Sequence, residues 1–240
     1  MSQADNRASQ TEERTLRAEV TIYYDLSLPD ERGLVEHTRR PSPLLIALHG
    51  YGGSKRQMMR EALRLAPEGF AVASLQGFHQ HLKEAKGPGG PLRYGFGWLT
   101  NFHPEESIAL HHRALLDLID NLVDEKVADP ARVFLLGFSQ SCALNYRFAF
   151  THTERLRGVI GVCGGLPGDW ESSAAYSRTD AAVLHLAGEH DEFYTPERVK
   201  DYAGRLLARA RDVEVKTYDA AHEIVDAMRE RARSWLADHI

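Results

Sequence analysis

The sequence predicts an α/β protein in which a mostly parallel, doubly wound sheet carries helices on both faces. Short apolar runs of strand length alternate along the chain with longer segments whose apolar residues recur at helical spacing, a pattern typical of parallel sheets. The 240 residues are 43% hydrophobic and 26% charged, as in an ordinary single globular domain. We therefore expect one domain over residues 15–240 and a polar, flexible tail over residues 1–14.

The first half of the chain alternates between apolar runs and amphipathic segments, except for one long stretch that has neither pattern. Period-two alternation or a continuous apolar run predicts a strand, and helical spacing of apolar residues predicts a helix. In chain order we predict an edge strand at 16–28, a buried strand at 43–48, a helix at 57–65, a strand at 70–75, a loop at 76–104 and a helix at 107–123.

The second half continues the same alternation to the end of the chain. Strands that alternate with helices build parallel units, so these segments should extend the same sheet. In chain order we predict a strand at 132–138, a helix at 142–150, strands at 156–163 and 181–188, a helix at 199–210, a strand at 213–218 and a final helix that includes Trp235 and Leu236.

The turn after the strand at 132–138 carries a candidate nucleophile. It has the sequence Gly137-Phe138-Ser139-Gln140-Ser141, in which small residues flank Ser139 two positions away on each side. Small residues let the backbone turn sharply between a strand and a helix, and such a turn holds a serine hydroxyl clear of the sheet. The last position of this G-x-S-x-G pattern is usually glycine, and here it is Ser141.

A nucleophilic serine needs a base and a carboxylate that orients the base. Asp191 follows the apolar strand at 181–188, and His222 follows the strand at 213–218. The order Ser, Asp, His is that of doubly wound serine hydrolases, so we predict that Ser139, Asp191 and His222 form a catalytic triad. Glu189 and Glu192 are rivals to Asp191 that spacing alone does not exclude.

The loop after the strand at 43–48 is the predicted oxyanion hole. Its sequence is His49-Gly50-Tyr51-Gly52-Gly53, and glycines allow the backbone to approach a substrate closely. Such sites take one backbone N–H from this loop and one from the residue after the nucleophile. We assign the two donors to the N–H groups of Tyr51 and Gln140, and we expect His49 to have a structural role.

These motifs resemble the phospholipase/carboxylesterase family of α/β-hydrolases, the group that includes acyl-protein thioesterases. The resemblance implies hydrolysis of carboxylic esters or thioesters without a cofactor. It departs from the family at Ser141 and Cys142, where two glycines are usual, and this bears on the geometry behind the nucleophile. The matching stretches are Leu48-His49-Gly50-Tyr51-Gly52-Gly53, Gly137-Phe138-Ser139-Gln140-Ser141, Gly188-Glu189-His190-Asp191 with Pro196, and Ala221-His222-Glu223-Ile224.

Aromatic residues in the 76–104 loop and beside Asp191 are candidates for the wall of a substrate pocket. Phe96 and Trp98 are the candidates in the loop, and Phe193 is the candidate next to the acid. Long loops in compact domains are usually functional. The alternative is that Phe96 and Trp98 anchor the loop to the core.

Composition limits the other partners. The formal net charge of −5 argues against a nucleic-acid partner, which requires a basic face. The polar start of the chain and the lack of a long apolar run predict a cytoplasmic protein with no membrane span. Cys142 and Cys163 should be buried free thiols. The 12 histidines, with pairs at His79/His81 and His111/His112, are better explained as surface or loop residues than as a metal site.

Other functions share the same pattern. A peptidase or a C–C bond hydrolase would use the same triad, and a catalytically silent binding protein could keep the fold. The oligomeric state is open, with a homodimer as one option.

Overall fold

A computed structural model describes residues 12–29, 40–83, 87 and 89–240. The predicted tail at 1–14 lies almost wholly outside this range. Among the described residues, no helix is both long and apolar enough to cross a membrane.

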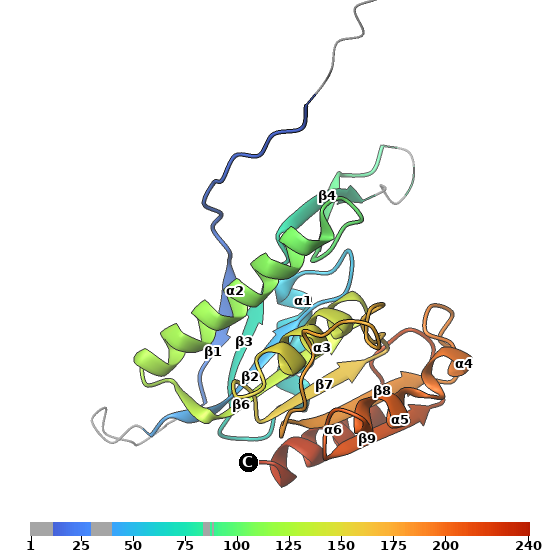
Figure 1. Ribbon diagram of the computed structural model, residues 1–240. Helices are drawn as coiled ribbons and strands as arrows, with labels where there is room; N and C mark the ends of the chain where they lie inside the picture. Colours follow the sequence, from blue (N-terminus) through green and yellow to red (C-terminus); the bar gives the residue numbers. More distant parts are fainter. Residues whose placement is uncertain (1–11, 30–39, 84–86, 88) are drawn as a thin grey trace, which may run out of the picture.

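The fold is built on a seven-stranded sheet in the order β1-β3-β2-β6-β7-β8-β9 (Figure 1). Edge strand β1 runs antiparallel to β3, and every other neighbouring pair is parallel. The predicted fold class is therefore confirmed. The strands are β1 (Tyr24–Ser27), β2 (Ser42–Leu48), β3 (Ala71–Leu75), β6 (Ala128–Phe138), β7 (Gly158–Val162), β8 (Ala182–Gly188) and β9 (Val213–Tyr218).

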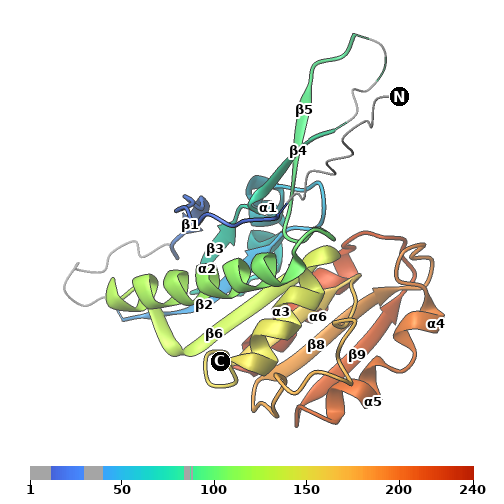
Figure 2. The same ribbon diagram turned by 45° about the horizontal axis from the view of Figure 1, so that its top comes forward.

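Helices cover both faces of this sheet, as Figure 2 shows for α2 and α3 in front and α1 behind. Alternate residues of each strand feed the two cores, because successive strand side chains point to opposite faces. In β2, Ile46 packs on the side of α2 and α3, whereas Leu45 packs on the side of α1 and α6. The helices are α1 (Lys55–Leu65), α2 (Pro104–Asp124), α3 (Gln140–Thr151), α4 (Pro196–Val199), α5 (Tyr202–Leu207) and α6 (Asp226–Asp238).

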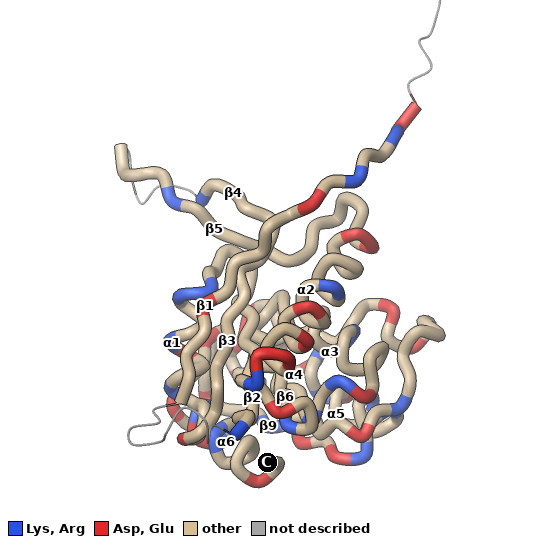
Figure 3. Tube along the Cα trace, turned by 90° about the vertical axis from the view of Figure 1, so that its left-hand side faces the viewer, with Lys and Arg blue, Asp and Glu red and all other residues tan. Residues whose placement is uncertain are grey.

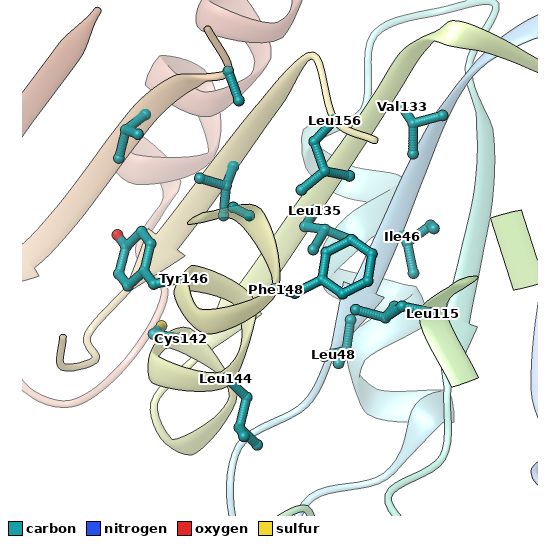
Figure 4. Packing of buried hydrophobic residues seen from close by; sticks show 14 of the residues in the cluster. Ile46, Leu48, Leu115, Val133, Leu135, Cys142, Leu144, Tyr146, Phe148 and Leu156 are labelled. Carbon is teal, nitrogen blue, oxygen red and sulfur yellow. The ribbon is translucent and has the colours of Figure 1, made fainter. Parts of the chain in front are cut away.

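The core under α3 fixes the helix that follows the candidate nucleophile. Phe148 of α3 is fully buried and reaches toward Leu135 of β6 and Leu115 of α2 (Figure 4). Burying a side chain of this size contributes roughly 1.5–3 kcal/mol. Packing against β6 and α2 on one face of the sheet therefore holds α3 in place.

Three predicted elements differ from the structure. The strand at 16–28 is reduced to Tyr24–Ser27, because its partner β3 offers only five residues for pairing. The helix at 199–210 is two short helices, the first of which begins at Pro196. The third difference is the predicted loop at 76–104.

This predicted loop contains a second, two-stranded sheet that projects from the body of the molecule (Figure 2). The strands β4 (His79–Lys83) and β5 (Arg93–Gly97) pair in antiparallel register. Gly95 lies opposite His81, and Gly97 lies opposite His79. Glycine lowers strand propensity, which is why the sequence pattern did not predict this hairpin.

His111 of the histidine pair on α2 is buried in the core, so the prediction of a surface or loop position is wrong for this residue. His111 is 1% exposed and packs edge-on against Trp98. On β8, His185 is fully buried and hydrogen bonds to the Tyr146 hydroxyl at 2.8 Å. Burial lowers the pKa of His111 to about 3 and the pKa of His185 to about 4. Both imidazoles are therefore neutral in the folded protein near neutral pH.

Because the pKa values of His111 and His185 are lowered in the folded protein, we expect the protein to lose stability in mild acid. The unfolded chain binds the same protons with an ordinary pKa near 6.5, so it holds more protons than the folded state below that pH. We expect the free energy of unfolding to fall by about 2 kcal/mol per buried histidine between about pH 7.5 and about pH 5. Urea unfolding at the two pH values measures this. His111→Gln should reduce the fall, whereas the exposed His190→Gln should not, and an equal fall in His111→Gln and the natural protein would contradict the argument.

Candidate active site

The three residues of the predicted triad lie at one edge of the sheet. Ser139 follows β6, Asp191 lies three residues past β8, and His222 lies in the loop after β9. Because these strands are parallel members of one sheet, their carboxyl ends open onto the same side. The parallel arrangement thus brings together residues that are far apart in the sequence.

Ser139 has a backbone conformation that few non-glycine residues adopt. Its φ is 56° and its ψ is −116°, so the turn stores strain of about 1–3 kcal/mol. Its N–H donates to the Val162 carbonyl at 3.0 Å, and its carbonyl accepts from the Cys142 N–H at 3.1 Å. Gly50 lies directly against the turn, since a Cβ added there would be 3.1 Å from the Ser139 Cβ.

A continuous hydrogen-bonded chain links the three side chains. His222 Nδ1 lies 2.8 Å from Asp191 Oδ2, and His222 Nε2 lies 2.9 Å from Ser139 Oγ. A carboxylate only accepts, so Nδ1 carries the proton and donates it, which leaves Nε2 free to accept from the serine hydroxyl. This tautomer is the one that a general base for Ser139 requires.

Asp191 is held as a buried carboxylate. Its residue is 2% exposed, and its Oδ1 accepts from the N–H groups of Phe193 and Tyr194, each at 2.9 Å. Burial by itself raises the pKa of Asp191, but these N–H groups and His222 outweigh it, so the pKa lies below its usual value. The rival carboxylates Glu189 and Glu192 are both exposed, and neither hydrogen bonds to His222.

Aromatic rings enclose the imidazole of His222. Phe138 and Phe193 have ring centroids 5.0 and 4.9 Å from it, and Tyr194 stacks at 6.0 Å. Phe193 is 55% exposed, so its ring is available at the rim of the site. Such rings restrict the orientation of the imidazole and keep water away from it.

The loop predicted as the oxyanion hole faces Ser139. Within it, the Gly52 N–H donates a hydrogen bond to the Phe96 carbonyl at 2.8 Å, and the Gly53 N–H donates to the Gly50 carbonyl at 3.0 Å. Tyr51 N–H has no acceptor among the described residues, so it is available to a ligand. The N–H of Gln140 is in the first turn of α3, where it has no intrahelical acceptor.

The side chain of Gln140 locks the elbow to the hairpin. Its Oε1 accepts from the Trp98 N–H at 2.9 Å, and its Nε2 donates to the Leu99 carbonyl at 3.1 Å. Trp98 in turn donates from Nε1 to the His49 carbonyl at 2.7 Å. Trp98 is 0% exposed, so it does not line a pocket. It anchors the segment after β5 to the core, which was the alternative interpretation of its sequence position.

Ser141 compensates for the glycine that is absent from the elbow. Its Oγ accepts from the Phe138 N–H at 2.9 Å and donates to the Leu48 carbonyl at 2.8 Å. The hydroxyl therefore connects the ends of β6 and β2 directly behind the nucleophile. Cys142 is accommodated in another way, because its Sγ fills the space over Gly164, where an added Cβ would lie only 2.3 Å from the sulfur.

His49 has the structural role expected of it. Its Nδ1 donates to the Gly50 carbonyl at 2.8 Å, and its Nε2 accepts from the Gly77 N–H at 2.9 Å and from Gln76 at 3.0 Å. Burial is the largest of the effects that lower the pKa of His49 to about 4. A neutral imidazole therefore fixes the shape of the oxyanion loop.

A cleft of about 500 Å³ lies beside the candidate triad. Its walls are the loop 49–53, one side of α1, Phe138, the segment 222–224, Lys83 and Arg229. Phe96 is not part of these walls. It lines a separate cavity of about 360 Å³ between the hairpin and the segment before β1, because its side chain points to the other face of β5.

Cys163 lies next to the triad. It is buried, and together with Asp191 and His222 it places one potential ligand atom of each residue within 4.8 Å of the others. The carboxylate and the imidazole are already hydrogen bonded to each other. Burial, followed by the charge of Asp191, raises the pKa of the Cys163 thiol to about 12, so it is a protonated neighbour of the acid near neutral pH.

The chain belongs to the Phospholipase/Carboxylesterase family, because the sequence profile of that family matches residues 30–240. The family resemblance of the sequence motifs is thereby confirmed. The region matched includes all the motifs of the candidate site.

Individual relatives are more distant. Acyl-protein thioesterase 1 of Gibberella zeae is 32% identical over 117 residues, which cover 47% of this chain and 49% of that protein. NocK of Nocardia uniformis subsp. tsuyamanensis is 29% identical over 128 residues, which cover 52% of this chain and 33% of NocK. The matched parts thus span a third to a half of these two relatives.

Solved structures share the fold. A carboxylesterase of Bacillus cereus superposes with a TM-score of 0.69 at 17% identity, over 91% of this chain and 95% of that one. A carboxylesterase of Mesorhizobium loti superposes with a TM-score of 0.63 at 22% identity, over 81% and 88%. At these identities the likeness concerns the α/β-hydrolase fold.

Sequence reasoning missed several residues that shape the site. The bracing roles of the Gln140 and Ser141 side chains depend on partners 41 to 93 positions away in the sequence, so no local pattern could have revealed them. Lys83 and His81 sit on a strand that was not predicted. The alternation of His79, His81 and Lys83 with Gln80 and Leu82 is the one local pattern in this segment that indicates a strand.

The hydroxyl bridge of Ser141 can be tested by measuring the free energy of unfolding of a variant that lacks it. Ser141→Ala leaves the Phe138 N–H and the Leu48 carbonyl without their partner in a buried site, and an unsatisfied buried group costs about 1–3 kcal/mol. We expect a loss of about that size in the free energy of unfolding, measured with urea. The exposed Ser172→Ala serves as the matched control, and no difference between the two variants would show that the hydroxyl bridge does not support the elbow.

Proposed function

We propose that this protein is a serine hydrolase that cleaves carboxylic esters, with thioesters as a second substrate class, through an acyl-enzyme intermediate. The observation that carries this proposal is the hydrogen-bonded chain Ser139–His222–Asp191, with distances of 2.9 and 2.8 Å. Family membership supports the reaction class. The thioester option rests on the likeness to an acyl-protein thioesterase.

In the first half of the reaction, Ser139 Oγ attacks the carbonyl carbon while His222 Nε2 takes the hydroxyl proton. Asp191 holds the imidazole in its reactive tautomer and stabilises the imidazolium that forms. The N–H groups of Tyr51 and Gln140 stabilise the negative charge on the former carbonyl oxygen. His222 then protonates the leaving alcohol or thiol, which gives the acyl-serine.

In the second half, His222 takes a proton from a water molecule, whose oxygen attacks the acyl carbon. The same two N–H groups stabilise the second tetrahedral intermediate. When it collapses, the imidazolium returns the proton to Ser139 and the carboxylic acid leaves. The hydrogen bonds from Ser139 to His222 and from His222 to Asp191 support both halves, because a nucleophile and base that are already oriented lower the cost of reaching the reactive geometry.

Two other functions use the same arrangement. A peptidase or a C–C bond hydrolase forms the same tetrahedral intermediate, so amide and diketone substrates have to be compared with esters. A silent binding protein would keep the fold without an activated serine. A fluorophosphonate reagent separates this last option, because it labels only an activated serine.

The nucleophile is tested by comparing the natural protein with Ser139→Ala. Because the serine oxygen forms the intermediate, we expect the variant to lose turnover by a factor of at least about 10³ while its unfolding curve stays close to that of the natural protein. The measurement is hydrolysis of 4-nitrophenyl esters from acetate to long acyl chains. Ser172→Ala is the control for an unrelated serine. Undiminished hydrolysis by Ser139→Ala would rule out the assignment.

A further inference from the structure

The face of the β4–β5 hairpin that turns toward the oxyanion loop carries basic and imidazole side chains. In the antiparallel register, His79, His81 and Lys83 share one face of β4 and lie opposite Gly97, Gly95 and Arg93. Tyr51 of the oxyanion loop stacks on His81, with ring centroids 4.6 Å apart and 6° between the planes. This face of the hairpin therefore covers the loop that holds the proposed oxyanion donor.

Lys83 extends along this face to the oxyanion loop. A Cβ added at Gly52 would lie 2.8 Å from Lys83 Cε and 3.1 Å from Nζ. Lys83 is half-buried, and it lines the same cleft as His222 and Tyr51. The ammonium is therefore within the cleft rather than on the outer surface of the hairpin. Burial is the largest effect that lowers the pKa of His49 in this loop, and the charge of Lys83 lowers it further, whereas the hydrogen bond to Gly50 raises it.

The charges around the cleft do not balance. Arg229 is paired with Glu61 at 2.6 Å and with Asp226 at 2.7 Å. In the ranges that the structure describes, Lys83 and Arg60 have no carboxylate partner within 4 Å. The remaining acidic wall residue, Glu223, is exposed. Among the described wall residues, the half-buried Lys83 and the exposed Arg60 therefore stand without a carboxylate partner against one exposed anion, Glu223, in a protein whose net charge is −5.

The register of the hairpin adds a second observation. Lys83 lies directly opposite Arg93, and Figure 3 shows Lys and Arg positions on both strands. Like charges directly opposite each other on one face destabilise a strand pair. An anion bound between the hairpin and the cleft would relieve this repulsion. The like charges of Lys83 and the exposed Arg93 thus favour a negatively charged occupant near Lys83.

We propose that the substrate of this protein is an ester that carries an anionic group, a carboxylate or a phosphate, which Lys83 binds with the help of Arg60 while the ester carbonyl lies at Ser139. The proposal rests on the proposed hydrolase function and adds the class of substrate. Lys83 and Arg60 are specificity residues, because they contact the substrate away from the reacting atoms. A charged hydrogen bond contributes about 1.5–3 kcal/mol, so one such contact changes affinity by about tenfold or more.

The test compares two esters that differ only at the end of the acyl chain, which is a carboxylate in mono-4-nitrophenyl glutarate and a methyl group in 4-nitrophenyl pentanoate. Both have a five-carbon acyl chain, and both release 4-nitrophenol. The quantity measured is the ratio of kcat/KM for the anionic ester to kcat/KM for the neutral ester. A ratio cancels any general damage that a substitution does to the oxyanion loop. We expect a ratio well above one for the natural protein.

The variants are Lys83→Gln and Arg60→Gln, with Lys216→Gln on β9 as the matched control for the loss of one positive charge. We expect Lys83→Gln to lower the ratio about tenfold, Arg60→Gln to lower it less, and Lys216→Gln to leave it unchanged. An unchanged ratio in both Lys83→Gln and Arg60→Gln would overturn the proposal.

The same pair of esters offers the anion only on the acyl side, so a second pair covers the alcohol side. Phenyl acetate and 4-acetoxybenzoate differ by one carboxylate on the leaving group, and their hydrolysis is followed by acid release. If the protein prefers the anionic ester in one of the two pairs and Lys83→Gln abolishes this preference, the proposal is supported. The pair concerned then shows whether the anion lies on the acyl side or the alcohol side of the ester. A preference in neither pair overturns it.

Binding separates this proposal from the proposed function. Ser139→Ala protein is titrated calorimetrically with mono-4-nitrophenyl glutarate and with 4-nitrophenyl pentanoate, and then with succinate and inorganic phosphate to rank the two anions. If the anionic ester binds more tightly than the neutral one and Lys83→Gln removes this difference, the anion site is supported. This holds even if the natural protein hydrolyses neither ester, and that failure would count against the proposed hydrolase function alone. Equal binding of the two esters, with rapid hydrolysis of both, would overturn the anion site alone.

Discussion

The strained turn at Ser139 is the constraint around which the rest of the site is built. A left-handed φ of 56° at a serine persists only where neighbouring contacts stabilise it. Here the contacts come from two strands and a helix, through the Val162 carbonyl of β7, the Ser141 bridge to Leu48 of β2 and the packing of α3. The proposed oxyanion donors then follow from the same geometry, because Gln140 is the next residue in the chain and Gly50 packs against the turn.

The hairpin extends this support to the opposite wall of the cleft. Its glycines at 95 and 97 allow the backbone to approach the oxyanion loop, since an added Cβ at Gly95 would lie 3.0 Å from the Gly52 Cα and one at Gly97 would lie 3.2 Å from the Tyr51 ring. The Phe96 carbonyl fixes the Gly52 N–H. One element therefore both shapes the loop and brings the cation Lys83 to it, so the proposed oxyanion hole and the proposed anion site share one support.

Four histidines of this protein fall into two kinds according to the groups that they contact. The buried imidazoles of His49, His111 and His185 are kept neutral, because burial lowers their pKa values to about 3 or 4. They act as hydrogen-bonding groups within the core and the oxyanion loop. His222 is different, because its Nδ1 donates to the buried carboxylate of Asp191 and its Nε2 accepts from the Ser139 hydroxyl. Among these four, only His222 therefore contacts the candidate nucleophile.

The sequence alone predicted the sheet and helix alternation, because apolar periodicity is a local property of each element. It also predicted which residues the structure would bring together at Ser139, since each follows a strand and parallel strands end at one edge. It could not assign Phe96 and Trp98, whose places depend on a hairpin whose glycines weaken the strand pattern. It could not reveal the partners of Gln140, Ser141 and Lys83 either. These contacts join segments far apart in the chain, so only tertiary packing decided them.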